Sequence, residues 1–170
     1  MGPEIVACYI AGVRALGLDV GSRTIGLALS DESQSWATAW ETLARAGQAA
    51  DAREVLDRAA SKEVSHCVVG WPLELDGRVG RRAKRVQAFI EVLESLRDER
   101  EMALVVELWD ERFSTAAAER TLLAADVSRA KRKEKIDAVA AQHILQGWLD
   151  AQARRRQDGD VPGAAEEPSQ

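Results

Sequence analysis

The chain has 170 residues, of which 46% are apolar and 30% are charged, and its formal net charge is −5. This composition can fill the core of one domain and excludes a chain that is disordered throughout. The acidic balance argues against a protein that coats nucleic acid by bulk charge, although a nuclease can handle phosphate with metal ions and a local basic patch. The two cysteines, Cys8 and Cys67, exclude a disulfide framework and a zinc site built from four cysteines.

No segment has the roughly 18 consecutive apolar residues that a membrane-spanning helix needs. Residues 1–12 contain Glu4 and no basic residue ahead of their apolar run, which is unlike a signal peptide. We therefore expect a cytoplasmic protein with reduced thiols and no membrane partner. We expect residues 1–12 to form an N-terminal extension, residues 13–151 the working domain and residues 152–170 a disordered tail.

Three short strands are predicted at the beginning of the working domain. Residues 13–20 and 24–30 are apolar runs around the turn Gly21-Ser22-Arg23, a pattern typical of an antiparallel hairpin. Residues 35–43 alternate in polarity and add a third strand. The side chains expected on one face of that strand are Trp36, Thr38, Trp40 and Thr42.

Helices and strands then alternate, in the order helix 49–63, strand 66–70, helix 80–98 and strand 103–109. Ser114 or Thr115 can cap a helix that runs through Leu123, and a last helix spans about 131–151. This order implies parallel pairing and right-handed crossovers. The predicted fold class is α/β, with a mixed five-stranded sheet. An antiparallel meander of three strands is joined to parallel strands, and helices lie on both faces.

The ends of the parallel strands are the expected place for chemistry, because ligands of open α/β sheets bind beyond the carboxyl ends of the strands. The first strand ends at Asp19, and the last ends at Asp110, Glu111 and Arg112. If these strands are neighbours, Asp19 lies close to one of Asp110 or Glu111.

A further carboxylate, Asp137, lies one turn into the last helix, at the margin of its apolar face. It can be an ordinary surface residue, or it can point over the sheet edge toward Asp19. Converging carboxylates repel one another, and a hard divalent cation removes that penalty. Two such ions can activate water and stabilise the leaving oxygen of a phosphodiester. These acids therefore indicate a metal-dependent nuclease. His66 and His143 have no evident nucleophile beside them, so a Ser-His-Asp site is disfavoured.

Basic residues form two runs that flank this rim, one at the start of helix 80–98 and one just before Asp137. Each run could be a solvated face, and together they favour phosphate binding. Arg23 and Arg112 are further candidates for phosphate, and Trp71 could either stack on a base or pack within its loop. The two runs are Arg78, Arg81, Arg82, Lys84 and Arg85, and Arg129, Lys131, Arg132, Lys133 and Lys135.

Four segments resemble the motifs of one family, in the order of that family. Residues 16–28, LGLDVGSRTIGLA, resemble the opening motif of the YqgF family, and residues 69–73 with Asp76-Gly77 resemble its second. Residues 110–115, DERFST, look like the third motif, and residues 135–141, KIDAVAA, look like the fourth. Members of this family are described as Holliday junction resolvases and as pre-16S rRNA nucleases.

The resemblance implies an RNase H-like fold and a nuclease that uses Mg²⁺ or Mn²⁺, with two ions when substrate is bound. The metal-binding catalytic acids would be Asp19, Glu111 and Asp137, with Asp110 as a neighbour. Trp71 departs from the smaller aliphatic residue expected at its position, which puts substrate contact there in question. The implied role is cytoplasmic maturation of the 5′ end of 16S rRNA from a structured RNA. Cleavage of branched DNA is the alternative, and the sequence does not decide between them.

Two other classes of function stay open at this point. Asp19-Val20-Gly21 followed by Gly26 also resembles the phosphate loop of actin-like ATPases, but that fold needs two such domains and 170 residues are too few. A non-catalytic nucleic-acid-binding module for ribosome assembly is the other, and the presence of all three acids argues against it. The sequence allows a monomer or a dimer, since a junction resolvase acts as a symmetric dimer and an RNA-trimming enzyme need not.

Overall fold

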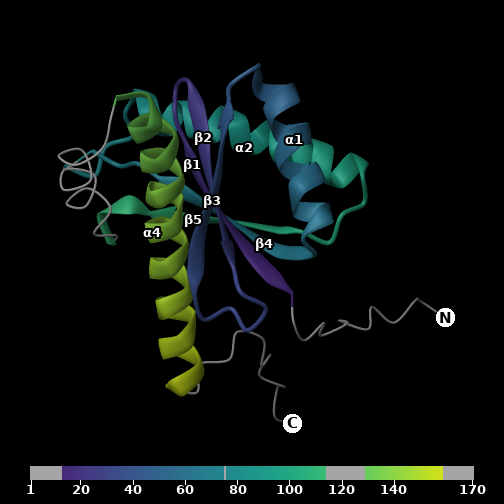
Figure 1. The fold of residues 1–170 in the computed structure, drawn as a ribbon, viewed down its shortest axis with the longest axis vertical. Coiled ribbons are helices and arrows are strands. Elements are labelled where there is room, and N and C mark those ends of the chain that lie inside the picture. The colour runs from purple at the N-terminus through teal and green to yellow at the C-terminus, as the bar shows by residue number, and fades with distance from the viewer. Residues whose placement is uncertain (1–12, 75, 114–128, 159–170) are drawn as a thin grey trace, which may run out of the picture.

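A mixed five-stranded sheet lies at the centre of the computed structural model, which describes residues 13–74, 76–113 and 129–158 (Figure 1). The strand order is β3-β2-β1-β4-β5. β1 pairs antiparallel with β2, and β2 with β3, whereas β4 pairs parallel with both β1 and β5. The predicted meander and the predicted parallel strands are both confirmed. The strands are β1 (Arg14–Val20), β2 (Thr24–Ser30), β3 (Ala37–Ala44), β4 (Val64–Trp71) and β5 (Val105–Asp110).

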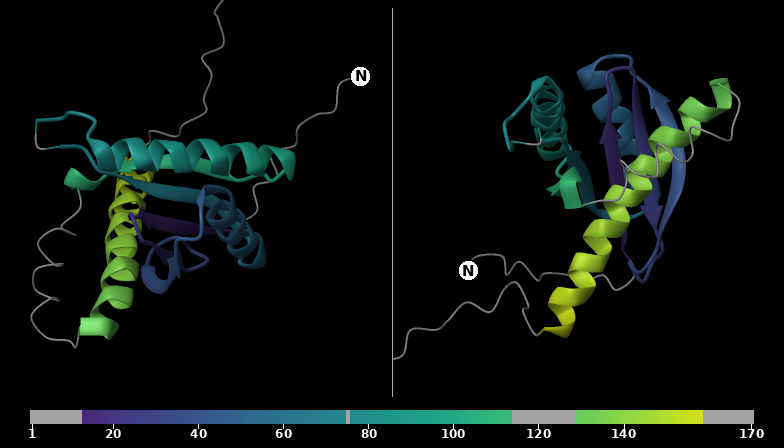
Figure 2. Two further views of the ribbon diagram at one scale, coloured as in Figure 1. Left: turned by 90° about the horizontal axis from the view of Figure 1, so that it is seen from above. Right: turned by 90° about the vertical axis from the view of Figure 1, so that its left-hand side faces the viewer.

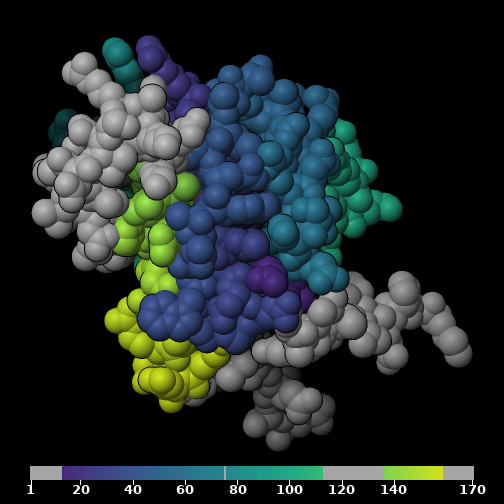
Figure 3. Space-filling view, viewed as in Figure 1, coloured from purple at the N-terminus to yellow at the C-terminus, as the bar shows by residue number. Residues whose placement is uncertain are grey.

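Helices cover both faces of the sheet, as Figure 2 shows from two directions. α1 (Gln48–Ser61) and α2 (Arg81–Glu99) pack on one face, and the long α4 (Arg129–Gln157) crosses the other. A short 3-10 helix, η1 (Glu111–Phe113), follows β5 directly. In the space-filling view, β3 and α1 occupy the visible face between α4 and the end of α2 (Figure 3). None of the helices in the described ranges is long and apolar enough to cross a bilayer.

The alternation of side chains along β1 divides the core in two. Leu16 and Leu18 join the cluster formed with α1 and α2, whereas Ala15 joins the cluster formed with α4. Because successive side chains of a strand point to opposite faces, Asp19 lies on the same face as Ala15. Asp19 therefore lies on the α4 face of the sheet.

α4 can approach this face closely because glycines face it. A Cβ atom at Gly17 would lie 2.7 Å from the Cβ of Leu145, and a Cβ atom at Gly26 would lie 1.9 Å from the carbonyl oxygen of Asp137. Since no side chain fits at either position, α4 rests directly on the backbone of β1 and β2. This contact fixes where along the sheet Asp137 lies.

The last helix is longer than predicted. It begins at Arg129 and ends at Gln157, so the expected end at residue 151 is wrong, and residues 152–157 of the expected tail are helical. Ala, Gln and Arg are good helix formers, and the arginines in the last turn stabilise the negative end of the helix dipole. The helix predicted from Ser114 or Thr115 to Leu123 lies outside the described residues, as do residues 1–12 and 159–170.

A β-bulge in β3 overturns the expected alternation of its side chains. Leu27 pairs with Glu41 and Ala28 pairs with Ala39, so Trp40 is an extra residue between them. An extra residue reverses the faces beyond it. Trp40 consequently packs on the α1/α2 cluster, whereas Thr42 pairs with Gly26 on the α4 face.

Cys67 is a core residue of β4 and gives a first prediction. Its side chain is completely buried, and burial raises the pKa of its thiol to about 12. Because the thiolate is the reactive form, we expect a Cys8→Ser variant to resist a thiol-specific disulfide reagent at pH 8. The same variant should react with one equivalent after unfolding in guanidinium. Rapid modification of the native variant would contradict the burial of Cys67.

Candidate active site

Asp19 lies one residue before the end of β1 and is 7% exposed. Its partner in the ladder with β2 is Gly26. Residues directly opposite each other in an antiparallel pair share a face of the sheet. Asp19 and Gly26 therefore lie side by side beneath α4.

Asp137 reaches this place because its helix rests on Gly26. The carbonyl oxygen of Asp137 occupies the space in which a Gly26 side chain would lie. The hydroxyl of Thr24, at the start of β2, donates a 2.6 Å hydrogen bond to Oδ2 of Asp137. The main chain of Asp137 thus lies over Gly26, which pairs with Asp19. The carboxylate of Asp137 is held at the same end of the sheet.

Glu111 comes to the same face from β5. Its Oε1 atom lies 2.9 Å from where a Gly70 Cβ would be, and Ile144 of α4 fills the rest of that space. Its side chain is 17% exposed, and its Oε2 atom is 3.8 Å from Nη2 of Arg82. Glu111 therefore lies between the end of β4 and the beginning of α2, on the α4 face.

Asp110 has a different environment. Its carboxylate accepts hydrogen bonds of 2.6–3.0 Å from the side chain and backbone of Arg112. The guanidinium of Arg112 holds the pKa of the Asp110 carboxyl below its usual range. Of the two acids that the sequence left open, Glu111 is therefore the one that faces α4, and Asp110 is neutralised locally.

The carboxylates of Asp19, Glu111 and Asp137 share one face and one end of the sheet, but they do not form a complete cation site. Within the three described ranges, no group of three or more His, Cys, Asp or Glu side chains is placed so that it could hold a metal ion. Their oxygens are nevertheless the donors that Mg²⁺ and Mn²⁺ prefer. The donor chemistry fits such an ion, and the side chains would have to turn toward one another to share it.

The predicted phosphate contacts differ in their surroundings. Arg23, in the turn after β1, is exposed, as are Arg81 and Arg82 in the first turn of α2. Arg112 is bound to Asp110. Trp71 is half-buried and packs against the α1/α2 cluster, which favours the packing interpretation over base stacking. The side chains of Arg132 and Lys135 lie outside the described part of the structure.

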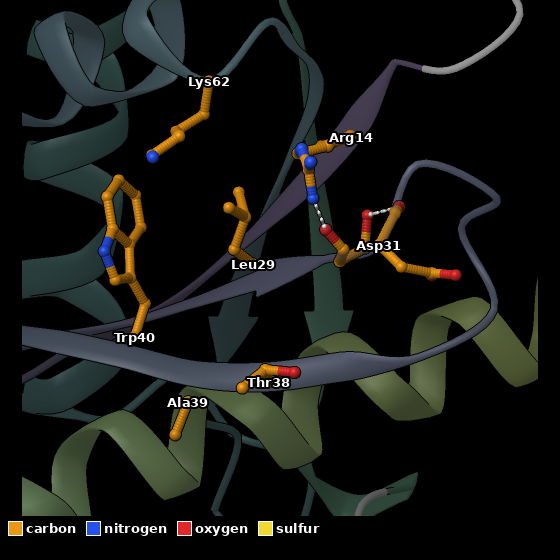
Figure 4. A pocket seen from close by; sticks show the side chains of 8 residues that line it. Arg14, Leu29, Asp31, Thr38, Ala39, Trp40 and Lys62 are labelled. Atoms are coloured by element: carbon orange, nitrogen blue, oxygen red, sulfur yellow. Dashed lines mark hydrogen bonds between the residues drawn. The ribbon is translucent and has the colours of Figure 1, made fainter.

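A hollow of about 360 Å³ lies elsewhere on the molecule (Figure 4). Arg14, the first residue of β1, lines it, whereas Asp19 lies near the other end of that strand. Arg14 donates to the carbonyl oxygen of Ser30 at 3.1 Å, and Nζ of Lys62 lies 5.7 Å from the ring centroid of Trp40. No acid of the candidate active site contributes to this hollow, so we do not place the chemistry there.

Thr24 is a site residue that the sequence analysis missed. Its bond to Asp137 joins residues 113 positions apart, and no local pattern reports such a contact. Thr24 lies five residues after Asp19 within the opening motif, and this position was the sequence feature that could have marked it as a site residue.

The comparisons with known proteins cover nearly the whole described domain. A family model described as "RuvX: Holliday junction resolvase" matches residues 13–151. A Myxococcus xanthus protein named "Putative pre-16S rRNA nuclease" is 49% identical over 139 residues, which are 82% of this chain and 89% of that protein. A Rhizobium etli protein of the same name is 45% identical over 158 residues, covering 92% of this chain and 93% of its own length.

Solved structures share the fold at low sequence identity. Thermus thermophilus RuvC in complex with a Holliday junction substrate superimposes with a TM-score of 0.54 at 14% identity, over 83% of this chain and 96% of that one. The yeast mitochondrial Holliday junction resolvase Ydc2 gives 0.54 at 13% identity, over 86% and 81%. The fold is thus RuvC-like, and the extent of the sequence matches shows that this chain belongs to the RuvX/YqgF family.

Proposed function

We propose that this chain is a nuclease that hydrolyses phosphodiester bonds of pre-16S rRNA, in the cytoplasm, where it would mature the 5′ end. The observation that carries the activity is the arrival of three carboxylates on one face and at one end of the sheet. They come from β1, from η1 and from α4. The RNA substrate is proposed from relatives that are 45–49% identical over more than four-fifths of this chain.

Asp19, Glu111 and Asp137 would hold Mg²⁺ or Mn²⁺, and two ions when substrate is bound. Such an ion would activate the attacking water and stabilise the leaving oxygen. Other residues of the chain position these acids. Thr24 orients the carboxylate of Asp137 through its hydroxyl. The guanidinium of Arg82 lies 3.8 Å from the Glu111 carboxylate, so it places a positive charge beside this acid.

The exposed arginines would bind the backbone of the substrate. Arg23 follows β1, and Arg81 and Arg82 open α2, so they come from two sides of the carboxylate end. Contacts with phosphate position a nucleic acid without reading its sequence. We therefore expect cleavage to weaken as salt rises, with little dependence on the bases at the cut.

A direct test compares two substrates under one set of conditions. The wild-type protein is incubated with a pre-16S RNA fragment that includes the 5′ precursor segment, and separately with a four-way DNA junction, in Mg²⁺, in Mn²⁺ and in EDTA. We expect metal-dependent cleavage of the RNA at discrete positions. The Asp19→Asn protein, purified in the same way, controls for contaminating nuclease. Failure to cut the RNA at any metal concentration would overturn the proposed substrate.

The second candidate function is resolution of Holliday junctions. It is favoured by the description of the matching family and by the likeness to RuvC bound to a junction. A resolvase cuts two strands symmetrically and acts as a dimer. Sedimentation at working concentration therefore accompanies the cleavage assay. A dimer that cuts only the junction would replace the RNA proposal with this one.

A further inference from the structure

Arg45, in the link between β3 and α1, has a side chain that makes several hydrogen bonds near the candidate active site. Its side chain is 13% exposed. Its guanidinium donates to Asp51, to the carbonyl oxygen of Gly21 at 2.8 Å and to Oε1 of Gln48 at 2.7 Å. The guanidinium carbon also lies 5.7 Å from the centroid of the Phe89 ring. The guanidinium is therefore held by three hydrogen-bond partners and an aromatic ring.

The Gly21 carbonyl belongs to the tight turn that joins β1 to β2. The turn is closed by a 2.8 Å hydrogen bond from the Gly21 amide to the carbonyl oxygen of Thr24. A Cβ atom at Gly21 would lie 2.9 Å from that same oxygen, so the turn is compact. The backbone of Arg45 adds a 2.8 Å bond to the carbonyl oxygen of Arg23. Arg45 thus holds the turn at two of its carbonyl oxygens.

This turn connects two of the three carboxylates. Asp19 precedes Gly21 by two residues, and Thr24, at the other end of the turn, donates its hydroxyl to Asp137. A shift of the turn would therefore displace both acids, and with them Arg23. Small displacements of this kind matter because outer residues that orient ligands typically contribute about 10–100-fold to metal affinity or activity.

We propose that Arg45 is a positioning residue for the nuclease: by holding the Gly21 carbonyl, it fixes the turn that sets Asp19 and the Thr24–Asp137 pair. This rests on the proposed function, since it assigns Arg45 a part in that same site. The guanidinium suits the task because its planar fork can reach Asp51, Gly21 and Gln48 at once. A lysine ammonium keeps the charge opposite the buried Asp51 but cannot span three partners in one plane.

The alternative is that Arg45 only stabilises the fold through its ion pair with Asp51. A matched control separates the two explanations. Arg58 also joins α1 to β3, through Glu41, and it bonds Glu54 as well. Arg58 has no bond to the turn. The variants Arg45→Lys and Arg58→Lys therefore make the same chemical change at two arginines that each bond an acid of α1.

The experiment measures three quantities for both variants: the melting temperature, the hydrogen exchange of the Gly21 amide by NMR, and kcat and KM for RNA cleavage at saturating Mg²⁺. For Arg45→Lys we expect Gly21 exchange to rise about tenfold and kcat to fall about tenfold or more, with KM changed less than threefold. Arg58→Lys should leave exchange and kcat within twofold of wild type, although its melting temperature falls comparably.

A second variant tests the same inference in case Arg45→Lys is too unstable to be measured. Asp51→Asn removes one ionic partner of Arg45 and keeps an acceptor for the amide of Ala46. As in Arg45→Lys, the exchange of the Gly21 amide should rise and kcat should fall. The inference is overturned if Gly21 exchange and kcat in Arg45→Lys match the wild type, or if Arg58→Lys loses as much activity. A wild-type protein that does not cut RNA would refute the proposed function instead, and unchanged Gly21 exchange would then refute the role of Arg45 in the turn.

Discussion

Replacing Asp19 by asparagine is expected to lower RNA cleavage on the order of 10³-fold, since loss of a single preorganised hydrogen-bond donor already costs about 10²–10³-fold in enzymes and a lost metal ligand should cost at least as much. Asparagine has the shape of aspartate but lacks the negative charge that a hard cation requires. The substitution leaves no cavity at this 7% exposed position. Activity and metal binding should therefore be lost from a folded protein.

Stabilisation by metal gives a second measurement for the same variant. Asp19 is a buried carboxylate at an end of the sheet that also carries Glu111 and Asp137. An ion that binds only the folded protein raises its melting temperature. Added Mn²⁺ should raise the melting temperature of the wild type and not that of the variant.

The control is the same substitution at Asp150. This residue is exposed on α4, thirteen residues beyond Asp137, which is roughly 20 Å along the helix axis. Asp150→Asn should cleave RNA at the wild-type rate. Cleavage by Asp19→Asn at the wild-type rate would exclude this acid from the reaction.

Introducing one methyl group at Gly26 should have the largest effect on stability. The Cβ of Gly26→Ala would lie 1.9 Å from the carbonyl oxygen of Asp137, 2.3 Å from its carbonyl carbon and 2.9 Å from the amide nitrogen of Ala138. All three atoms are backbone, so no side-chain rotation can relieve the overlap and α4 must move away. We expect a loss of about 3 kcal/mol in the free energy of unfolding, at the upper end of the range for overpacked cores.

Cleavage should also fall in the fraction of Gly26→Ala that is folded, because lifting α4 separates Asp137 from Thr24 and from Asp19. Urea unfolding followed by circular dichroism gives the stability. Activity is then measured well below the melting temperature. Gly47→Ala provides the scale for backbone strain alone, since its Cβ would meet no atom within 4 Å and its φ is +130°. A loss at Gly26 no greater than that at Gly47 would contradict the contact with α4.

The fold could be predicted from the sequence because each element carries a local signal. The apolar runs of β1 and β4 and the helical spacing of α1 and α2 fix element type, and short right-handed connections leave few topologies. Strand ends then placed Asp19 near the end of β5. The position of the strand end did not separate Asp110 from Glu111, and the choice of Glu111 came from the family motif, because the difference depends on one residue at the end of β5 and on the side chain of Arg112.

The remaining differences come from contacts between distant residues. The bulge at Trp40 arises from the pairing of β3 with β2. The sequence of β3 by itself shows a regular alternation of polarity, so it gives no sign of the extra residue. The bonds from Thr24 to Asp137 and from Arg45 to Gly21 have no sequence signature, because each joins separate elements. The spacing among the three carboxylates depends on their rotamers, which periodicity does not specify.

The direct contact between α4 and the backbone at Gly26 has a consequence for the synthesis of the protein. Asp137 is translated more than a hundred residues after Asp19, on α4, the last element that the structure describes. A nascent chain that has folded only its first four strands lacks two of the three acids, Glu111 and Asp137, and the helix that covers this face. Under the proposed function, a nascent chain would therefore complete its set of three acids only after α4 has been translated, so the ribosome that makes it would not meet an active copy before then.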